Sequence, residues 1–221
     1  YAQGIAPNWT RFVLVSVDVQ GNRFDVQVTA FGIDGRRAII DRFALHNPPP
    51  DAPGAADRMM DPATYIEDWE ALRPLLKTVY PVEGEAFGLH AMALACDFHG
   101  KPGVSDNATK FWQARRRAGE ALQFYMVRGH GGFKVEGRQW YKEPTRAADG
   151  KQARDIKLLN IATDKHKDTT FAGLARPDVG PGSLILGQWL PDEILKEFTA
   201  EKRGDKGWLK RPNMPRNEAI D

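Results

Sequence analysis

Two aspartates follow apolar runs in the same local pattern. Asp18 comes directly after VLVSV, and Asp97 comes directly after AMALAC. Each is expected where a strand leaves the core, and open α/β sheets usually bind ligands at the carboxyl ends of their strands. If the two strands are neighbours, both carboxylates face one crevice, where their oxygens suit Mg²⁺ or Mn²⁺. The alternative is that each aspartate only caps a turn at the end of a strand.

The first third of the chain predicts an antiparallel meander. Residues 12–20 form an expected strand that is apolar on both faces, hence central in a sheet covered on both sides. Residues 23–32 and 36–46 alternate as the second and third strands, with turn signals at Gly21-Asn22 and Asp34-Gly35 between them. Residues 47–62, rich in Pro and Gly, are expected to form an exposed excursion.

The remaining segments alternate between helices and strands. An amphipathic helix over residues 64–80, kinked at Pro74, is expected to bury Tyr65, Ile66, Trp69, Leu72, Leu76 and Val79. Further strands are expected to end near Asp97 and to cover residues 123–129, the start of 157–174, and 182–188; helices are expected over residues 107–122, the rest of 157–174, and 191–203. Residues 129–154 have loop character. The fold class is therefore α/β, with a mixed sheet flanked by helices.

Length and composition indicate one globular domain across residues 1–221, or two at most. The chain is 42% hydrophobic and 27% charged, with a net charge of +2. Such a small charge gives no global sign of a nucleic-acid partner; any surface of that kind must be local, and binding to it weak and salt-sensitive. A single cysteine, Cys96, excludes an internal disulfide and is expected to be a buried small hydrophobe. No apolar run predicts a membrane span, and a first residue of Tyr1 suggests a piece of a longer protein.

Several basic residues are candidates for contact with a phosphate backbone. Arg128 ends the FYMVRG strand, and Lys167 follows Asp164 by three residues at a helix start. Asp164 is most simply an N-cap. Lys134 and Arg138 stand among aromatic residues in the loop GHGGFKVEGRQWYKEPTR. That mixture suits flexible contact with DNA, although a surface hairpin explains it equally well.

Other polar clusters favour simpler roles. The run Arg115–Arg117 lies on an expected helix and is interpreted as a solvated face. His99 and Cys96 have C-x-x-H spacing without two further ligands, which is too few for zinc. Glu218 precedes Asp221 by three residues on one face of a helix expected to begin near the end of the chain. Glu218 is therefore a candidate either to support Asp221 or to serve as an alternative ligand.

The ordered set of motifs resembles the nuclease domain of the large subunit of tailed-phage terminases, the lambda-like family. The segments that carry this resemblance are VSVDVQGNRFDVQVTAFG, ACDFHG, YMVRG, IATDKHKD, WLPDEILKEFTAEKR, GWLKRP and RNEAID. They occur in the family's order over nearly the whole chain. No G-x-x-x-x-G-K-[ST] segment is present, so the ATPase motor of such a terminase is not expected here.

The resemblance implies an RNase H-like fold and an endonuclease that cuts concatemeric viral double-stranded DNA. It implies two Mg²⁺ or Mn²⁺ ions held by Asp18, Asp97 and Asp221, with Asp18 bridging both. The implied partners are an amino-terminal ATPase domain, the terminase small subunit and the portal or procapsid, all in the host cell cytoplasm and without a membrane. Competing hypotheses are an RNase H-like transposase, integrase or resolvase, and a non-catalytic DNA-binding module.

Overall fold

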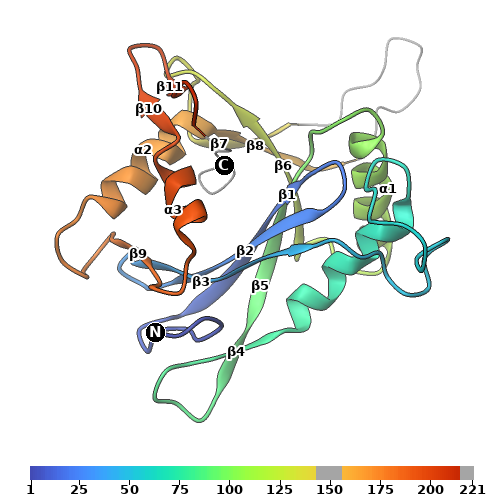
Figure 1. Cartoon of the computed structure of the whole chain (residues 1–221), viewed down its shortest axis with the longest axis horizontal. Coiled ribbons are helices and arrows are strands. Elements are labelled where there is room, and N and C mark those ends of the chain that lie inside the picture. Colours follow the sequence, from blue (N-terminus) through green and yellow to red (C-terminus); the bar gives the residue numbers. More distant parts are fainter. Residues whose placement is uncertain (143–155, 215–221) are drawn as a thin grey trace.

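A mixed sheet of nine strands organises the computed structural model, which describes residues 1–142 and 156–214 (Figure 1). The antiparallel part is the predicted meander of β1 (Phe12–Val19), β2 (Phe24–Phe31) and β3 (Arg37–Leu45). Beside β1, three strands continue the sheet in parallel: β5 (Gly88–Asp97), β6 (Phe124–His130) and β8 (Leu158–Ala162). The predicted mixed α/β sheet is thus confirmed.

Three short strands complete the sheet. β4 (Val79–Pro81) pairs antiparallel with the start of β5, and β9 (Leu184–Leu186) pairs parallel with β3. β7 (Gln139–Lys142) pairs antiparallel with β8, inside a region predicted to be a loop. The sequence prediction missed β7 because its backbone bonds go to residues 158–161, across a segment with no clear periodicity.

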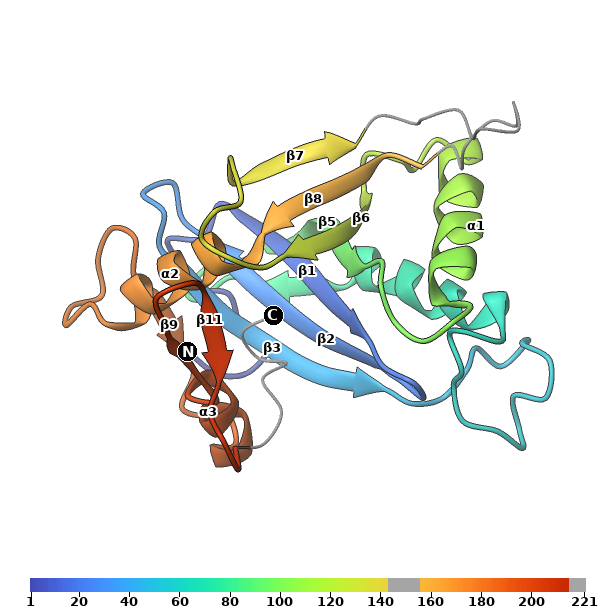
Figure 2. The same cartoon turned by 90° about the horizontal axis from the view of Figure 1, so that it is seen from above.

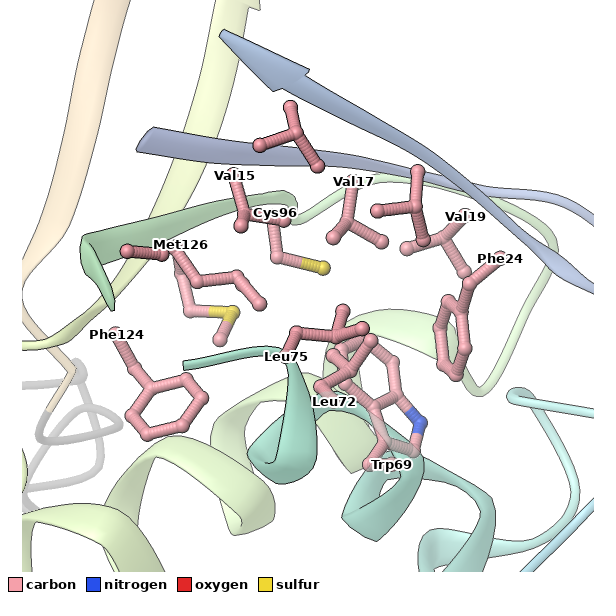
Figure 3. Close-up of a cluster of buried hydrophobic side chains, with 14 of the residues drawn as sticks. Val15, Val17, Val19, Phe24, Trp69, Leu72, Leu75, Cys96, Phe124 and Met126 are labelled. Carbon is pink, nitrogen blue, oxygen red and sulfur yellow. The ribbon is translucent and has the colours of Figure 1, made fainter. Parts of the chain in front are cut away.

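One face of the sheet carries the main hydrophobic core. Val15, Val17 and Val19 of β1 point towards Trp69, Leu72 and Leu75, as Figure 3 shows. The helices that cover this face are η1 (Ile66–Lys77) and α1 (Val104–Arg117). The aromatic rings of Trp69, Phe111 and Phe124 follow one another across the core at centroid distances of 5.9 and 5.3 Å.

The opposite face of β1 differs from the prediction. The strand is central, but Ser16 is exposed and Leu14 and Asp18 are only half-buried. Helices pack on this face further along the sheet, where Ile39 of β3 contacts Leu190 and Phe198 in a second, smaller core. The apolar run therefore reflects one buried face and a partly open one, and the open face carries Asp18.

The first helix is a 3₁₀-helix and not the predicted kinked α-helix. A 3₁₀-helix has three residues per turn, so residues three apart share a face. Accordingly Trp69, Leu72 and Leu75 are buried. Leu76, which the sequence predicted to be buried, is only half-buried. Val79, also predicted to be buried, is 51% exposed in β4.

The carboxyl-terminal third forms a separate group beside β3 and β9 (Figures 1 and 2). It contains α2 (Thr163–Leu174), α3 (Asp192–Phe198) and a hairpin of β10 (Glu201–Arg203) with β11 (Trp208–Lys210). The predicted helix over 191–203 therefore ends early, because its last residues pair with β11 instead. The helix expected near the end of the chain lies outside the described residues.

The Pro-rich segment 47–62 is not wholly exposed. Met60 is 1% exposed within the main core, and Pro48 and Ala52 are also buried. The backbone N–H of Met60 donates to the carbonyl oxygen of His46 at 2.9 Å. The segment thus packs against the domain near both of its ends.

Candidate active site

Asp18 and Asp97 lie side by side at the carboxyl ends of two adjacent parallel strands. The β1–β5 register pairs Val17 with Cys96, so the two aspartates occupy the next position on each strand. Val17 and Cys96 point into the core (Figure 3). Because side chains alternate along a strand, both aspartates point to the opposite, partly open face.

Local donors hold both carboxylates. The side-chain amide of Gln20 donates to Asp18 Oδ2, and the backbone N–H of His99 donates to Asp97 Oδ1 at 3.1 Å. Burial raises the pKa of the Cys96 thiol well above its usual value, and the charges of Asp97 and Asp18 raise it further. The negative charges of Asp18 and Asp97 therefore both act on the buried Cys96 thiol, which stays protonated.

The residues present fit a divalent metal centre in part. Two carboxylates share one edge, which provides the hard oxygen ligands that Mg²⁺ and Mn²⁺ prefer. Among the described residues, however, no group of three or more His, Cys, Asp or Glu side chains is arranged to hold a metal ion. The implied third ligand, Asp221, and the candidate Glu218 both lie outside the described residues.

A third carboxylate on the same face was missed by the sequence prediction. Asp25 of β2 is the register partner of Asp18. Its Oδ1 accepts from Arg23 Nε at 2.8 Å, and its buried Oδ2 has no hydrogen-bond partner within the part of the chain that the structure describes. The signal was available: a tight turn at Gly21-Asn22 sets a register in which Asp18 and Asp25 face each other.

A cleft of about 380 Å³ lies beside Asp25, between β3 and α3. Its two arginines stand next to carboxylates, Arg23 beside Asp25 and Arg42 at 3.3 Å from Glu197. Because the charges in the cleft are balanced in this way, we do not count it as part of a DNA-binding surface.

Arg128 stands at the same edge of the sheet but on the other face. Asp97 is the register partner of Val127, so strand alternation places Arg128 opposite to the carboxylates. Burial lowers the pKa of His99, and the positive charge of Arg128 and the proximity of His130 lower it further. His130 also contacts Asn160 Oδ1 at 2.8 Å. On the sequence alone His99 was set aside because its C-x-x-H spacing with Cys96 lacks two further ligands, and His130, which lies in no recognisable ligand spacing, was not predicted.

Lys167 has a protein partner where the sequence predicted a contact with DNA. Its side chain is 9% exposed, and its Nζ lies 2.8 Å from Glu201 Oε2. Asp164 is not the N-cap, which is Ala162. It is buried and accepts from the backbone N–H groups of Gly132 and Trp208. Both side chains attach α2 to its neighbours, which favours structural roles.

Lys134 and Arg138 lie on the surface, and Arg138 contacts α2. Both are exposed, and Arg138 Nη1 donates to Thr169 Oγ1 at 3.1 Å. The β10–β11 hairpin adds Lys202, Lys206 and Lys210, which are also exposed. The arginine run on α1 is divided: Arg115 is buried and pairs with Glu70 and Glu120 at 3.2 and 2.9 Å, whereas its two neighbours are exposed, as predicted.

The fold and the site together define an α/β protein with paired carboxylates at the carboxyl edge of its parallel strands. Comparison with protein families identifies the protein more closely. The model of the terminase large subunit gpA endonuclease domain matches residues 1–221, and the chain belongs to this family. It is therefore a nuclease domain of the phage DNA-packaging machinery. Neither the curated proteins nor the solved structures gave a match. Among the described residues, no helix is long and apolar enough to cross a membrane.

Proposed function

We propose that residues 1–221 form one RNase H-like domain that hydrolyses phosphodiester bonds of concatemeric double-stranded DNA by a two-metal mechanism. One observation carries the proposal: Asp18 and Asp97 are adjacent on an open face, at the carboxyl ends of parallel β1 and β5. The strand order β3-β2-β1-β5-β6, antiparallel and then parallel, supports the RNase H-like assignment. Asp221 is the third proposed ligand, and Glu218 is proposed to lie behind it and support it.

The side chains at this edge suit the chemistry of phosphodiester hydrolysis. Bound there, two Mg²⁺ or Mn²⁺ ions would supply an activated water and neutralise charge on the leaving oxygen. Asp18, on the central strand, is the proposed shared ligand. Gln20 and the His99 backbone N–H orient the two carboxylates, a function that outer hydrogen bonds commonly serve at metal sites.

The DNA contacts that we propose use basic residues outside this edge. Lys134 and Arg138, with Phe133 and Trp140 beside them in sequence, suit contact with a phosphate backbone. The exposed lysines of the β10–β11 hairpin extend this surface. Arg128 is a weaker candidate, since it faces away from the carboxylates, and Lys167 is the weakest because it is buried against Glu201.

The proposed partners follow from membership in the terminase family. They are double-stranded DNA, an amino-terminal ATPase domain, the terminase small subunit and the portal or procapsid, in the host cell cytoplasm. Family membership favours this role over a transposase, integrase or resolvase.

Cleavage of supercoiled plasmid tests the proposal. The parent protein, Asp18→Asn and Asp97→Asn are compared in Mg²⁺, Mn²⁺, Ca²⁺ and EDTA. We expect nicking and linearisation by the parent in Mg²⁺ or Mn²⁺, and loss of both in either variant and in EDTA. Asp34→Asn is the matched control, because Asp34 lies in the β2–β3 turn at the opposite end of the strands. Metal-dependent cutting that survives Asp18→Asn would contradict the assignment, and a parent that binds DNA without cutting would favour a non-catalytic module.

A further inference from the structure

The end of the Pro-rich segment packs against the loop that follows Asp97. Asp61 Oδ1 lies 2.9 Å from Lys101 Nζ in that loop. Gly103, the last residue before α1, has a φ of +104°, and a Cβ there would stand 2.5 Å from the carbonyl oxygen of Ala63. The two segments thus approach as closely as backbones can, with a salt bridge beside the contact.

A fully buried carboxylate fixes the Pro-rich side of this contact. Asp68 of η1 is 0% exposed, and its carboxylate accepts hydrogen bonds from both terminal nitrogens of Arg58, at 2.7 and 2.8 Å. The same carboxylate accepts the backbone N–H of Asp61 at 2.6 Å. The Arg58 guanidinium also stacks 3.7 Å from the centroid of the Tyr65 ring. A bidentate pair with planar stacking holds the backbone around Asp61 in one geometry.

The other side of the contact is the loop 98–103, and hydrogen bonds within a few residues connect it to Asp97. The carbonyl oxygen of Lys101 accepts from the N–H of Val104, and that of Phe98 accepts from Ser105 Oγ at 2.9 Å. Next to Phe98, the N–H of His99 donates to the Asp97 carboxylate at 3.1 Å. The loop 98–103 is therefore attached to α1 on one side and to the candidate metal ligand on the other.

We propose that residues 58–63 act as a brace that positions Asp97 through the loop 98–103. Arg58, Asp61 and Lys101 are the positioning residues, and none of them is a metal ligand in this scheme. The inference rests on the proposed role of Asp97 as a metal ligand. It gives the end of the Pro-rich segment 47–62 a function, which is to position that ligand. The Asp61–Lys101 pair is partly exposed, with side chains 31% and 46% accessible, so its loss affects the order of the loop more than global stability.

The test uses Asp61→Asn and Lys101→Met in the full chain, with two readouts. Hydrogen exchange followed by mass spectrometry reports the order of residues 98–103 without metal. Titration with Mn²⁺ gives the metal concentration for half-maximal plasmid nicking. We expect faster exchange in 98–103 and a roughly tenfold higher Mn²⁺ midpoint in both variants, the lower end of the effects of outer hydrogen bonds on metal sites.

Three further variants make the outcome decisive. The double variant should match either single one, and Lys101→Arg, which keeps a positive charge opposite Asp61, should keep exchange slow. Arg73→Met is the matched control, because it breaks ion pairs of similar exposure with Glu70 and Glu120, neither of which lies in the loop 98–103. If exchange in residues 98–103 stays unchanged in Asp61→Asn, the brace is overturned, even if Lys101→Met makes that exchange faster. A parent that never cuts would instead refute the proposed function, and the exchange readout would still decide the brace.

Discussion

At the scale of single residues, the charges near the site separate into those that face solvent and those enclosed by protein partners. Lys134 and Arg138 are exposed, whereas Lys167 is enclosed beside Glu201. Their sequence contexts look alike, since each is a basic residue in a polar segment. Burial of the side chain and the presence of a protein partner therefore decide which of these residues can reach a DNA backbone. Neither property can be predicted from the residues next to them in the sequence.

Lys167→Met should destabilise the fold and leave DNA binding largely intact. The substitution leaves Glu201 buried without this partner, and breaking a buried ion pair from one side costs about 3 kcal/mol. Urea unfolding measures the loss. Adding Glu201→Gln to Lys167→Met should recover part of the lost free energy of unfolding. The control Lys165→Met, on the more accessible side of α2, should lower that free energy by well under about 1 kcal/mol. Weakened DNA binding with unchanged stability would restore the sequence-based prediction for Lys167.

At the scale of elements, the β10–β11 hairpin directs some of its side chains at α2 and its lysines at solvent. Asp168 of α2 accepts from Arg203 and from the indole N–H of Trp208, both at 3.0 Å, and Phe171 stacks on Trp208 at 4.3 Å. These contacts fix the hairpin on α2 and leave its lysines on the surface.

Alanine at Lys202, Lys206 and Lys210 should weaken binding to duplex DNA and reduce its salt dependence. Each lost phosphate contact lowers the slope of log K against log salt by about 0.9. Fluorescence anisotropy in EDTA measures binding without cleavage. Lys110→Ala with Arg117→Ala is the control, because these exposed residues lie on α1, away from the hairpin (Figure 2). Equal slopes for the hairpin variant and the parent would remove the hairpin from the proposed DNA surface.

At the scale of the whole molecule, salt bridges connect segments that are distant along the chain. Burial opposes ionisation of Asp61 and Glu120, but ion pairs and hydrogen bonds outweigh it and lower the pKa of both carboxyls. Lys101 and Thr64 act on Asp61, and Arg115 and Arg73 act on Glu120. These carboxylates link the Pro-rich segment, η1 and α1 to the rest of the domain.

Acid should therefore destabilise the domain through these contacts. A carboxyl whose pKa is lowered by folding contributes stability above its unfolded pKa and loses it as the pH falls through its folded value. The reference values are 3.8 for Asp61 and 4.5 for Glu120. We expect the free energy of unfolding to be constant for these groups above about pH 5 and to fall below it. Urea titrations from pH 7 to pH 3 measure this, and Glu120→Gln should flatten the acid limb.

The sequence by itself determined the meander, most of the alternating strands and helices, and the placement of Asp18 and Asp97 at strand ends. Those features follow from periodicity over a few residues, because burial of one face imposes a repeat of two on a strand. The 3₁₀ geometry of η1 escaped the prediction, since apolar residues at positions 65, 66, 69, 72, 76 and 79 also fit the repeat of an α-helix.

Only the tertiary structure decided which charged groups meet. The parallel pairing of β1 with β5 brings Asp18 beside Asp97, and packing encloses Lys167 with Glu201. The contact between Asp61 and Lys101 likewise joins two segments that no local pattern relates. Ion pairs and hydrogen bonds form between positions far apart in the chain, so their partners depend on how whole elements pack and not on the residues beside them.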